Sequence, residues 1–217
     1  MNAAQKASGV AVLVFGEARP PRSLRDLPTH RIADPADLDA PLDTSGRLVV
    51  VGRDADLAAV LTRLLRTDRL DVEVGYVPRR RTRATRAYRL PSGLRAARRA
   101  RRGTARRVPL IRDETGTVIV GRGAWLPTQG AASMRGEAVV DDTVLFDGDV
   151  TAIWIEPTSA LPGLRAAVAG RWVRWFSGRA AQLGTTGAVV VRDGVAAPRP
   201  IRRSSFYRNV EGWQLVR

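Results

Sequence analysis

The stretch Arg47-Leu48-Val49-Val50-Val51-Gly52-Arg53-Asp54-Ala55-Asp56-Leu57 decides the fold of the first half of this 217-residue chain. It opens with an apolar, largely β-branched run, which is typical of a strand buried on both faces of a parallel sheet. After Gly52 the apolar residues recur at spacings of three and four, which predicts an amphipathic helix. These residues are Leu57, Val60, Leu61, Leu64 and Leu65. The stretch therefore predicts a strand, a glycine turn and a helix.

Similar elements flank this unit. Residues 10–15 form another continuous apolar run, which predicts a buried first strand rather than the core of a signal peptide. Residues 70–77 alternate and end at Pro78, as in a strand, and residues 94–102 predict a short helix with arginine on most of its circumference. The connection from Pro20 to Asp43 has too little periodicity to assign.

The pattern becomes β-rich from Val108 onward. Asp147-Gly148 and Asp193-Gly194 are each flanked by predicted strands, which indicates two hairpin turns. Residues 164–176 form one helix-like stretch, whose aromatic residues we expect in the core; these are Trp172, Trp175 and Phe176. The sequence therefore predicts an α/β half with a Rossmann-like parallel sheet over 1–107, followed by an antiparallel, sandwich-like β domain over 108–217.

Composition excludes several chemistries. Apolar residues make up 44% and charged residues 26% of the chain, which is typical of a globular protein. The chain has no cysteine, so thiol enzymes, disulfides and cysteine-based metal sites are excluded. His30 is the single histidine and lies in the proline-rich connection, so a site of several histidines is excluded and no metal ligand set is predicted.

The net charge of +15 is concentrated in one segment. Residues 79–107, called here the basic segment, contain 13 arginines and no acidic residue. Such a segment is either a solvated face or an anion-binding surface, and its concentration favours anion binding. Because no apolar run is long enough to span a bilayer and no targeting segment is evident, we expect a cytoplasmic protein that makes at most peripheral contact with a membrane.

The order of these elements resembles the diacylglycerol kinase-like lipid kinases, which are relatives of the NAD kinases. In that family an apolar strand ends in Gly-Gly-Asp-Gly-Thr, with which Gly52-Arg53-Asp54-Ala55-Asp56 aligns without a gap. A later strand of the family ends in Ile-Pro and precedes a Gly-Thr-Gly-Asn loop, and Val77-Pro78 followed by residues 79–83 corresponds to it. Residues 103–108 resemble the exit into the family's β domain, and Asp193-Gly194-Val195 resembles its Asp-Gly-Glu motif.

The resemblance implies a set of site residues. For a nucleotide or phosphate site they are Gly52, Arg53, Asp54, Asp56, Arg80, Arg81, Thr82 and Arg83, with ATP and Mg²⁺ as the implied cofactors. Asp193 is implied as the general base near the acceptor hydroxyl. Structural explanations stand beside these roles: Asp54 and Asp56 as helix-capping acids, and Asp193-Gly194 as a simple type I′ turn.

Departures from the motifs affect the expected activity. Arg53 and Ala55 replace glycines that let phosphate approach backbone N–H groups, although arginine also offers a bidentate fork for phosphate. Three functions remain open: a lipid-kinase-like protein with an altered, weak or inactive nucleotide site that binds a nucleotide or an anionic lipid headgroup; a basic nucleic-acid-binding protein; and a regulatory pseudoenzyme that binds a protein partner. The sequence does not indicate an oligomeric state.

Overall fold

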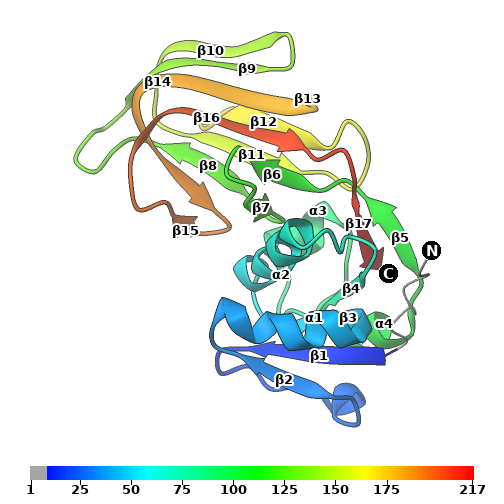
Figure 1. Cartoon of the computed structure of the whole chain (residues 1–217). Coiled ribbons are helices and arrows are strands. Elements are labelled where there is room, and N and C mark those ends of the chain that lie inside the picture. Colours follow the sequence, from blue (N-terminus) through cyan, green and yellow to red (C-terminus); the bar gives the residue numbers. More distant parts are fainter. Residues whose placement is uncertain (1–8) are drawn as a thin grey trace, which may run out of the picture. The chain divides into compact units, whose positions relative to one another are not determined.

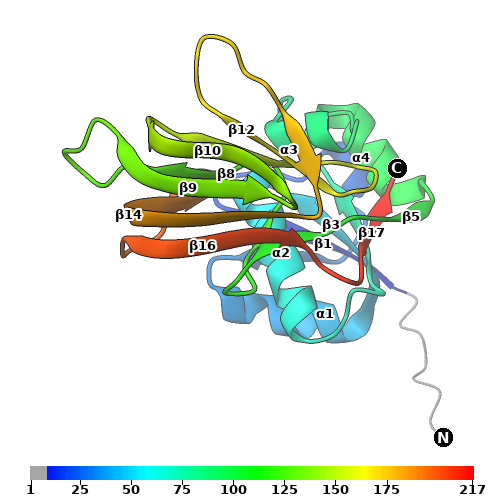
Figure 2. The same ribbon diagram turned by 90° about the horizontal axis from the view of Figure 1, so that it is seen from above.

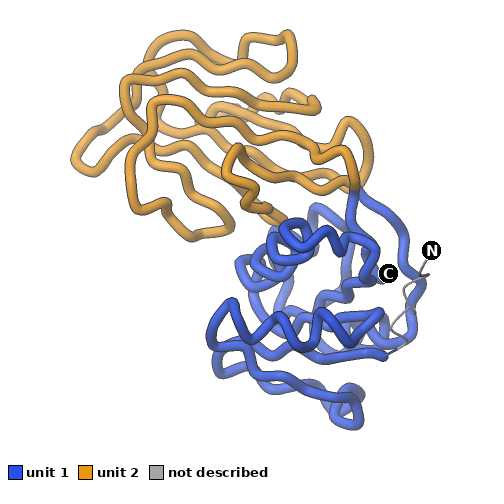
Figure 3. The backbone as a smooth tube through the Cα atoms, viewed as in Figure 1, with its two compact units in different colours: residues 1–108, 212–217 blue, residues 109–211 orange. Residues whose placement is uncertain are grey.

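The computed structural model describes residues 9–217 and divides them between two compact units (Figure 3). The N-terminal unit comprises the residues up to Val108 together with Gly212–Arg217, and the β unit comprises Pro109–Glu211. The single lysine, Lys6, lies outside the described residues. The last segment of the chain differs from the expected division after residue 107, because its strand belongs to the sheet of the N-terminal unit.

The N-terminal unit is built on one six-stranded sheet (Figure 1). Its strands, in spatial order, are β2 (Thr29–Ile32), β1 (Gly9–Phe15), β3 (Ser45–Val51), β4 (Glu73–Tyr76), β17 (Trp213–Val216) and β5 (Ala105–Val108). All neighbouring pairs are parallel except β17 and β5. The parallel sheet predicted from residues 10–15 and 47–51 is therefore confirmed.

The helices of this unit begin where the sequence changes period. They are α1 (Asp39–Thr44), α2 (Asp54–Arg66), α3 (Arg83–Ala87) and α4 (Gly93–Arg102), with 3-10 turns at Arg22–Leu24 and Pro35–Leu38. The segment left unassigned by the sequence, Pro20–Asp43, contains β2, both turns and most of α1. Its only strand is short and sits at the sheet edge, so it has little apolar pattern to reveal it.

Both faces of β3 are buried, as its continuous apolar run predicts. Val49 and Val51 belong to the core cluster that includes Ala96, Ala97 and Ala100 of α4. Small residues let α4 lie close to the sheet: a Cβ added at Gly75 would be only 2.6 Å from the Ala100 Cβ atom. The arginines of α4 therefore face outward because alanine occupies the packed side.

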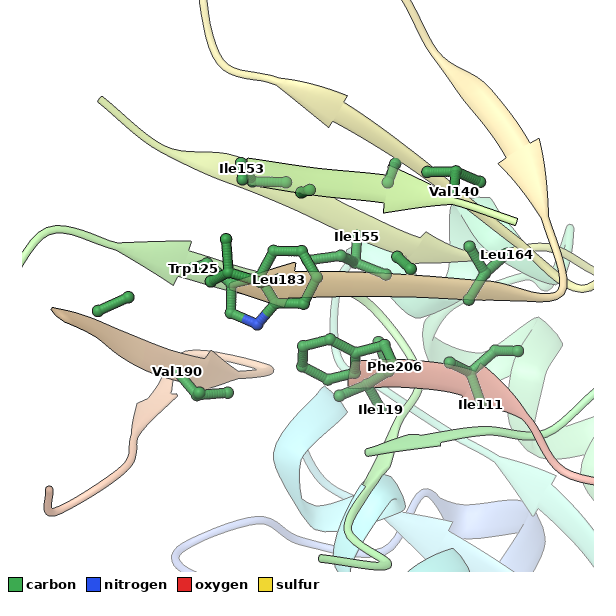
Figure 4. Close-up of a cluster of buried hydrophobic side chains, with 14 of the residues drawn as sticks. Ile111, Ile119, Trp125, Val140, Ile153, Ile155, Leu164, Leu183, Val190 and Phe206 are labelled. Atoms are coloured by element: carbon green, nitrogen blue, oxygen red, sulfur yellow. The ribbon is translucent and has the colours of Figure 1, made fainter. Parts of the chain in front are cut away.

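The β unit is an antiparallel arrangement of eleven strands. They are β6 (Ile111–Asp113), β7 (Val118–Ile119), β8 (Gly123–Leu126), β9 (Met134–Val140), β10 (Thr143–Val150), β11 (Ile153–Pro157), β12 (Leu164–Val168), β13 (Phe176–Gly178), β14 (Ala180–Arg192), β15 (Val195–Ala196) and β16 (Ile201–Arg208). The long strand β14 pairs with β9 and β16 at its start and with β8 at its end. The hydrophobic core of the β unit contains Trp125, Ile155, Leu183 and Phe206 (Figure 4).

Of the two hairpin turns predicted for the β unit, one is wrong and one is confirmed. Asp147-Gly148 lies inside β10, and the turn joining β9 to β10 falls at Asp141-Asp142, where Asp141 adopts a φ of 49°. Aspartate tolerates this left-handed conformation, so the turn needs no glycine. The Asp193-Gly194 turn is confirmed: it joins β14 to β15, and both of its residues have positive φ angles.

The predicted helix over 164–176 is also wrong. Leu164–Val168 pairs with β11 along its whole length, so sheet pairing overrides the helical spacing. Residues 169–175 form a loop, and Phe176 begins β13. Trp172, expected in the core, is 86% exposed.

Candidate functional site

A cavity of about 850 Å³ lies at the carboxyl ends of β1, β3 and β4, within the N-terminal unit. Its lining comes from four segments of the chain: residues 15–21 after β1, residues 51–56 after β3, residues 77–82 after β4, and the start of α4. The connection after β1 leads to β2 on one side, and the connection after β3 leads to β4 on the other, so the strand order reverses between β1 and β3. Ligands of open α/β sheets bind at such a reversal.

The turn from β3 into α2 is closed by its own aspartate. The backbone N–H of Arg53 donates to the Asp56 carboxylate at 2.6 Å, and the Arg53 guanidinium lies 3.7 Å from the same oxygen. A Cβ at Gly52 would lie 2.5 Å from that Asp56 oxygen, Oδ2. Gly52 is therefore required by the approach of Asp56, and the Arg53 N–H already has an anionic acceptor.

Asp54 holds the neighbouring loops together. One of its carboxylate oxygens accepts from the Tyr76 hydroxyl at 2.8 Å, and the other accepts from the Ala84 N–H at 3.1 Å. Burial, together with the adjacent Asp54 carboxylate, raises the pKa of Tyr76 well above its usual range, so this hydroxyl remains a donor. Asp54 thus links the start of α2 with the end of β4 and the start of α3.

The segment after β4 is also fixed by local bonds. The Thr82 hydroxyl accepts from the Thr85 N–H at 3.2 Å, and the Thr85 hydroxyl lies 2.8 Å from the Thr82 nitrogen, which forms a reciprocal cap on α3. The Gly93 N–H donates to the Pro78 carbonyl at 2.8 Å, which closes the loop between β4 and α4. Arg79 and Arg80 are therefore carried on a backbone with a defined path.

The cavity lining is rich in arginine. Arg19, Arg53, Arg79 and Arg80 line it and are exposed, whereas Glu17 and Asp56 are its acidic residues. Within residues 9–217, Arg19, Arg79 and Arg80 have no carboxylate at ion-pair distance, and the Asp56 carboxylate caps its own helix. Guanidinium groups bind phosphate and carboxylate oxygens in bidentate geometry. The arrangement suits an anionic ligand.

The structure brings most of the predicted binding residues together. Gly52, Arg53, Asp56, Arg80 and Thr82 line the cavity. Asp54 lies between the lining residues Arg53 and Asp56 but does not itself line the cavity, and its carboxylate accepts from Tyr76 and Ala84.

Other residues differ from the predicted set. Arg81 and Arg83 are exposed and are absent from the cavity lining. Sequence reasoning missed Arg19, Arg79 and the loop after β1. That loop follows a predicted buried strand, so the rule that parallel strands place their carboxyl ends at one edge was the signal available for it.

Asp193 lies in the β unit, in the turn between β14 and β15. Its carboxylate accepts backbone N–H groups of Val120, Gly121 and Arg122 at 2.7–2.9 Å. By accepting from three backbone N–H groups, Asp193 fixes the loop that precedes β8. A role as general base stays a prediction.

The arginines of the basic segment have different environments. Arg101 donates to the Ser23 carbonyl at 2.6 Å and forms a bidentate pair with Asp26 at 2.6 and 2.7 Å, so it joins α4 to the turn at Arg22–Leu24. The outer side of α4 carries four exposed arginines, Arg95, Arg98, Arg99 and Arg102. Only Arg79 and Arg80 of the segment reach the cavity lining.

Two carboxylates close to the cavity are engaged in bonds within the protein. Among the described residues, no three or more His, Cys, Asp or Glu side chains gather as metal ligands. Asp54 and Asp56, the carboxylates that the resemblance implied, are both engaged in hydrogen bonds to the protein.

No helix within residues 9–217 has the length and apolarity needed to cross a membrane. No protein-family model and no curated protein matches this sequence.

Solved structures do match. A diacylglycerol kinase from Bacillus anthracis strain Sterne is similar with a TM-score of 0.69 at 9% identity, over 96% of this chain and 96% of that chain. An NAD kinase from Archaeoglobus fulgidus in complex with ATP is similar with a TM-score of 0.63 at 12% identity, over 96% and 93%. Yeast NADH kinase complexed with NADH is similar with a TM-score of 0.64 at 8% identity, over 98% and 84%. The chain therefore has the fold that diacylglycerol kinases share with NAD kinases, as the order of its motifs predicted.

Proposed function

We propose that this protein is a lipid-kinase-like, cytoplasmic nucleotide-binding protein in which arginine side chains replace the glycine phosphate cradle. The observation that carries the proposal is the cavity at the β1, β3 and β4 ends, lined by Arg19, Arg53, Arg79 and Arg80. Its place in the sheet is the one where open α/β folds bind ligands, and the fold is shared with a kinase solved with ATP. The phosphate groups of a nucleotide are the ligand that best matches this charge.

Phosphoryl transfer to a lipid hydroxyl is expected to be weak or absent. The resembled motif has threonine where this chain has Asp56, which adds a carboxylate to the cavity lining. The same carboxylate accepts the Arg53 N–H, which is then not available to a phosphate oxygen. Because phosphoryl transfer depends on positioning and electrostatics, a displacement of the triphosphate by about 1 Å costs on the order of a hundredfold in rate. This supports a catalytically weak relative or a regulatory pseudoenzyme.

Nucleotide binding is testable with matched arginine pairs. Arg79→Gln with Arg80→Gln removes two cavity arginines, whereas Arg81→Gln with Arg83→Gln removes two exposed neighbours outside the lining. We expect ATP and ADP to raise the melting temperature of the parent, since a ligand at 100 times its Kd adds about 2.7 kcal/mol of stability. The cavity pair should weaken binding by about tenfold or more in calorimetry, and the control pair by less than about threefold.

Two results would contradict this proposal. One is the absence of any shift with ATP or ADP, with or without Mg²⁺. The other is an equal loss in both pairs, which would indicate diffuse attraction to the whole basic segment. If the parent then binds oligonucleotides with a steep salt dependence, the exposed arginine side of α4 favours the nucleic-acid-binding alternative.

Turnover is tested with the same protein. Transfer of the ATP γ-phosphoryl group to the hydroxyl of diacylglycerol in mixed micelles should be near background in the parent. Arg53→Gly with Ala55→Gly restores the close approach of a phosphate to the backbone and should increase turnover, although it removes one cavity arginine and costs about 1 kcal/mol for a glycine in α2. Robust activity of the parent that Arg79→Gln with Arg80→Gln abolishes would show that the arginines have taken over the function of the glycine cradle.

A further inference from the structure

The loop between β12 and β13 presents large apolar side chains to solvent. It spans residues 169–175 and extends away from the strands that it joins (Figure 2). Trp172 is 86% exposed and Val173 is 43% exposed, and the flanking Arg171 and Arg174 are exposed too. An exposed tryptophan next to an aliphatic residue needs an explanation, because burial of such a side chain is strongly favourable.

The base of this loop is braced. The Arg165 guanidinium lies 4.3 Å from the centre of the Trp175 ring and is paired with Glu156 at 2.7 Å. At the same end of the loop, Arg174 lies 4.8 Å from the centre of the Phe176 ring. The aromatic residues at the base thus pack on arginines of the β unit, while Trp172 and Val173 remain at the tip.

Along the chain, the loop and its flanking segments carry positive charge only, although Glu156 pairs with Arg165 at the base of the loop. No aspartate or glutamate occurs from Pro157 to Arg192, and this stretch includes the whole loop with Arg171 and Arg174. Tryptophan prefers the boundary between water and hydrocarbon, where its ring is buried and its N–H stays hydrated. Arginine beside it is attracted to the negative surface of anionic lipids. A braced, cationic loop with a Trp-Val tip matches the chemistry of an anionic bilayer interface.

We propose that residues 169–175 dock the β unit on anionic membranes, with Trp172 and Val173 entering the interface and Arg171 and Arg174 contacting lipid headgroups. Nucleic acid is a less suitable partner, because an aliphatic valine at the tip adds nothing to stacking or phosphate contact. This inference concerns a surface distinct from the cavity lining, so it stands or fails independently of nucleotide binding.

The test is binding of the full chain to vesicles of phosphatidylcholine with and without phosphatidylglycerol. The parent should sediment with the anionic vesicles and much less with neutral ones. Trp172→Ser with Val173→Ser should weaken this binding by about tenfold or more, and Arg171→Gln by about fivefold. Matched controls in the same unit are Val144→Ser, which changes a valine that is 63% exposed, and Arg202→Gln, which changes an exposed arginine. Both controls should bind like the parent.

Insertion of Trp172 is read directly by fluorescence. Brominated phospholipids in the anionic vesicles should quench the parent, and Trp172→Phe should lose most of that quenching although the other four tryptophans remain. Unchanged melting temperatures establish that the variants are folded.

Three outcomes would overturn the proposal: no binding of the parent to anionic vesicles, equal binding by the tip variant and its controls, or quenching that persists without Trp172. Vesicle binding without any nucleotide effect would refute only the cavity function. A nucleotide effect without vesicle binding would refute only the docking loop.

Discussion

Three arginines of the β unit, Arg122, Arg165 and Arg192, differ from two arginines at the cavity of the N-terminal unit in having carboxylate partners. In the β unit, Glu156 forms ion pairs with both Arg122 and Arg165, and the fully buried Asp113 forms an ion pair with Arg192. At the cavity, within residues 9–217, Arg79 and Arg80 have no carboxylate at ion-pair distance. The same residue type therefore stabilises the fold at these three positions and remains available to an anion at the cavity.

The largest expected effect breaks a buried pair of the β unit. Asp113 accepts from Arg192, from the Thr115 hydroxyl at 2.7 Å and from the Thr117 N–H at 3.0 Å. Asp113→Ala leaves the Arg192 charge without its partner and releases the turn after β6, so we expect a loss of about 3–5 kcal/mol in the free energy of unfolding measured with urea. Asp71→Ala is the control, because the Asp71 side chain is 61% exposed in its pair with Arg69, and it should cost less than about 1 kcal/mol. Similar losses in the two variants would contradict the distinction between buried and exposed pairs.

An intermediate effect is expected beside the cavity, at Asp54. Tyr76→Phe removes the hydroxyl that donates to the Asp54 carboxylate, so unfolding free energy should fall by about 2 kcal/mol. Tyr207→Phe is the control: the Tyr207 ring, whose centre lies 4.6 Å from Arg112, is kept and stability should change little. A neutral Tyr76→Phe would mean that Asp54 is not a structural carboxylate and is more available to a ligand than its bonds indicate.

The smallest effect concerns Asp26 and Arg101 on the surface of the N-terminal unit. The hydrogen bonds from the Arg101 guanidinium hold the pKa of Asp26 below its ordinary value of 3.8. A depressed pKa in the folded state stabilises the protein above the unfolded value, and that contribution is lost as the pH falls through the folded value. The melting temperature of Asp26→Asn should therefore lie slightly below that of the parent at pH 6, and the gap should shrink below pH 4. A gap that stays constant over this range would refute the ionic origin of the effect.

Much of the candidate site was predictable from sequence because it follows from strand ends. The apolar run at residues 47–51 and the proline after β4 located two of the three loops around the cavity. Arg19 was missed although it closely follows the predicted buried strand β1, whose carboxyl end lies at the same sheet edge as those of β3 and β4. The individual roles were less predictable: Asp54, Asp56 and Asp193 lie in motif-like positions, yet their carboxylates hold backbone N–H groups or a hydroxyl.

The sequence by itself determined the parallel α/β half, the helix over α2, the antiparallel character of the second half and the concentration of positive charge. These features depend on local periodicity and composition, which can be read from residues close together in the sequence. Only the tertiary structure decided that residues 164–168 form a strand, that β17 joins the first sheet, and which arginines have partners. Pairing between distant strands and the approach of an arginine to a carboxylate far along the chain depend on the folded backbone, and no local pattern specifies them.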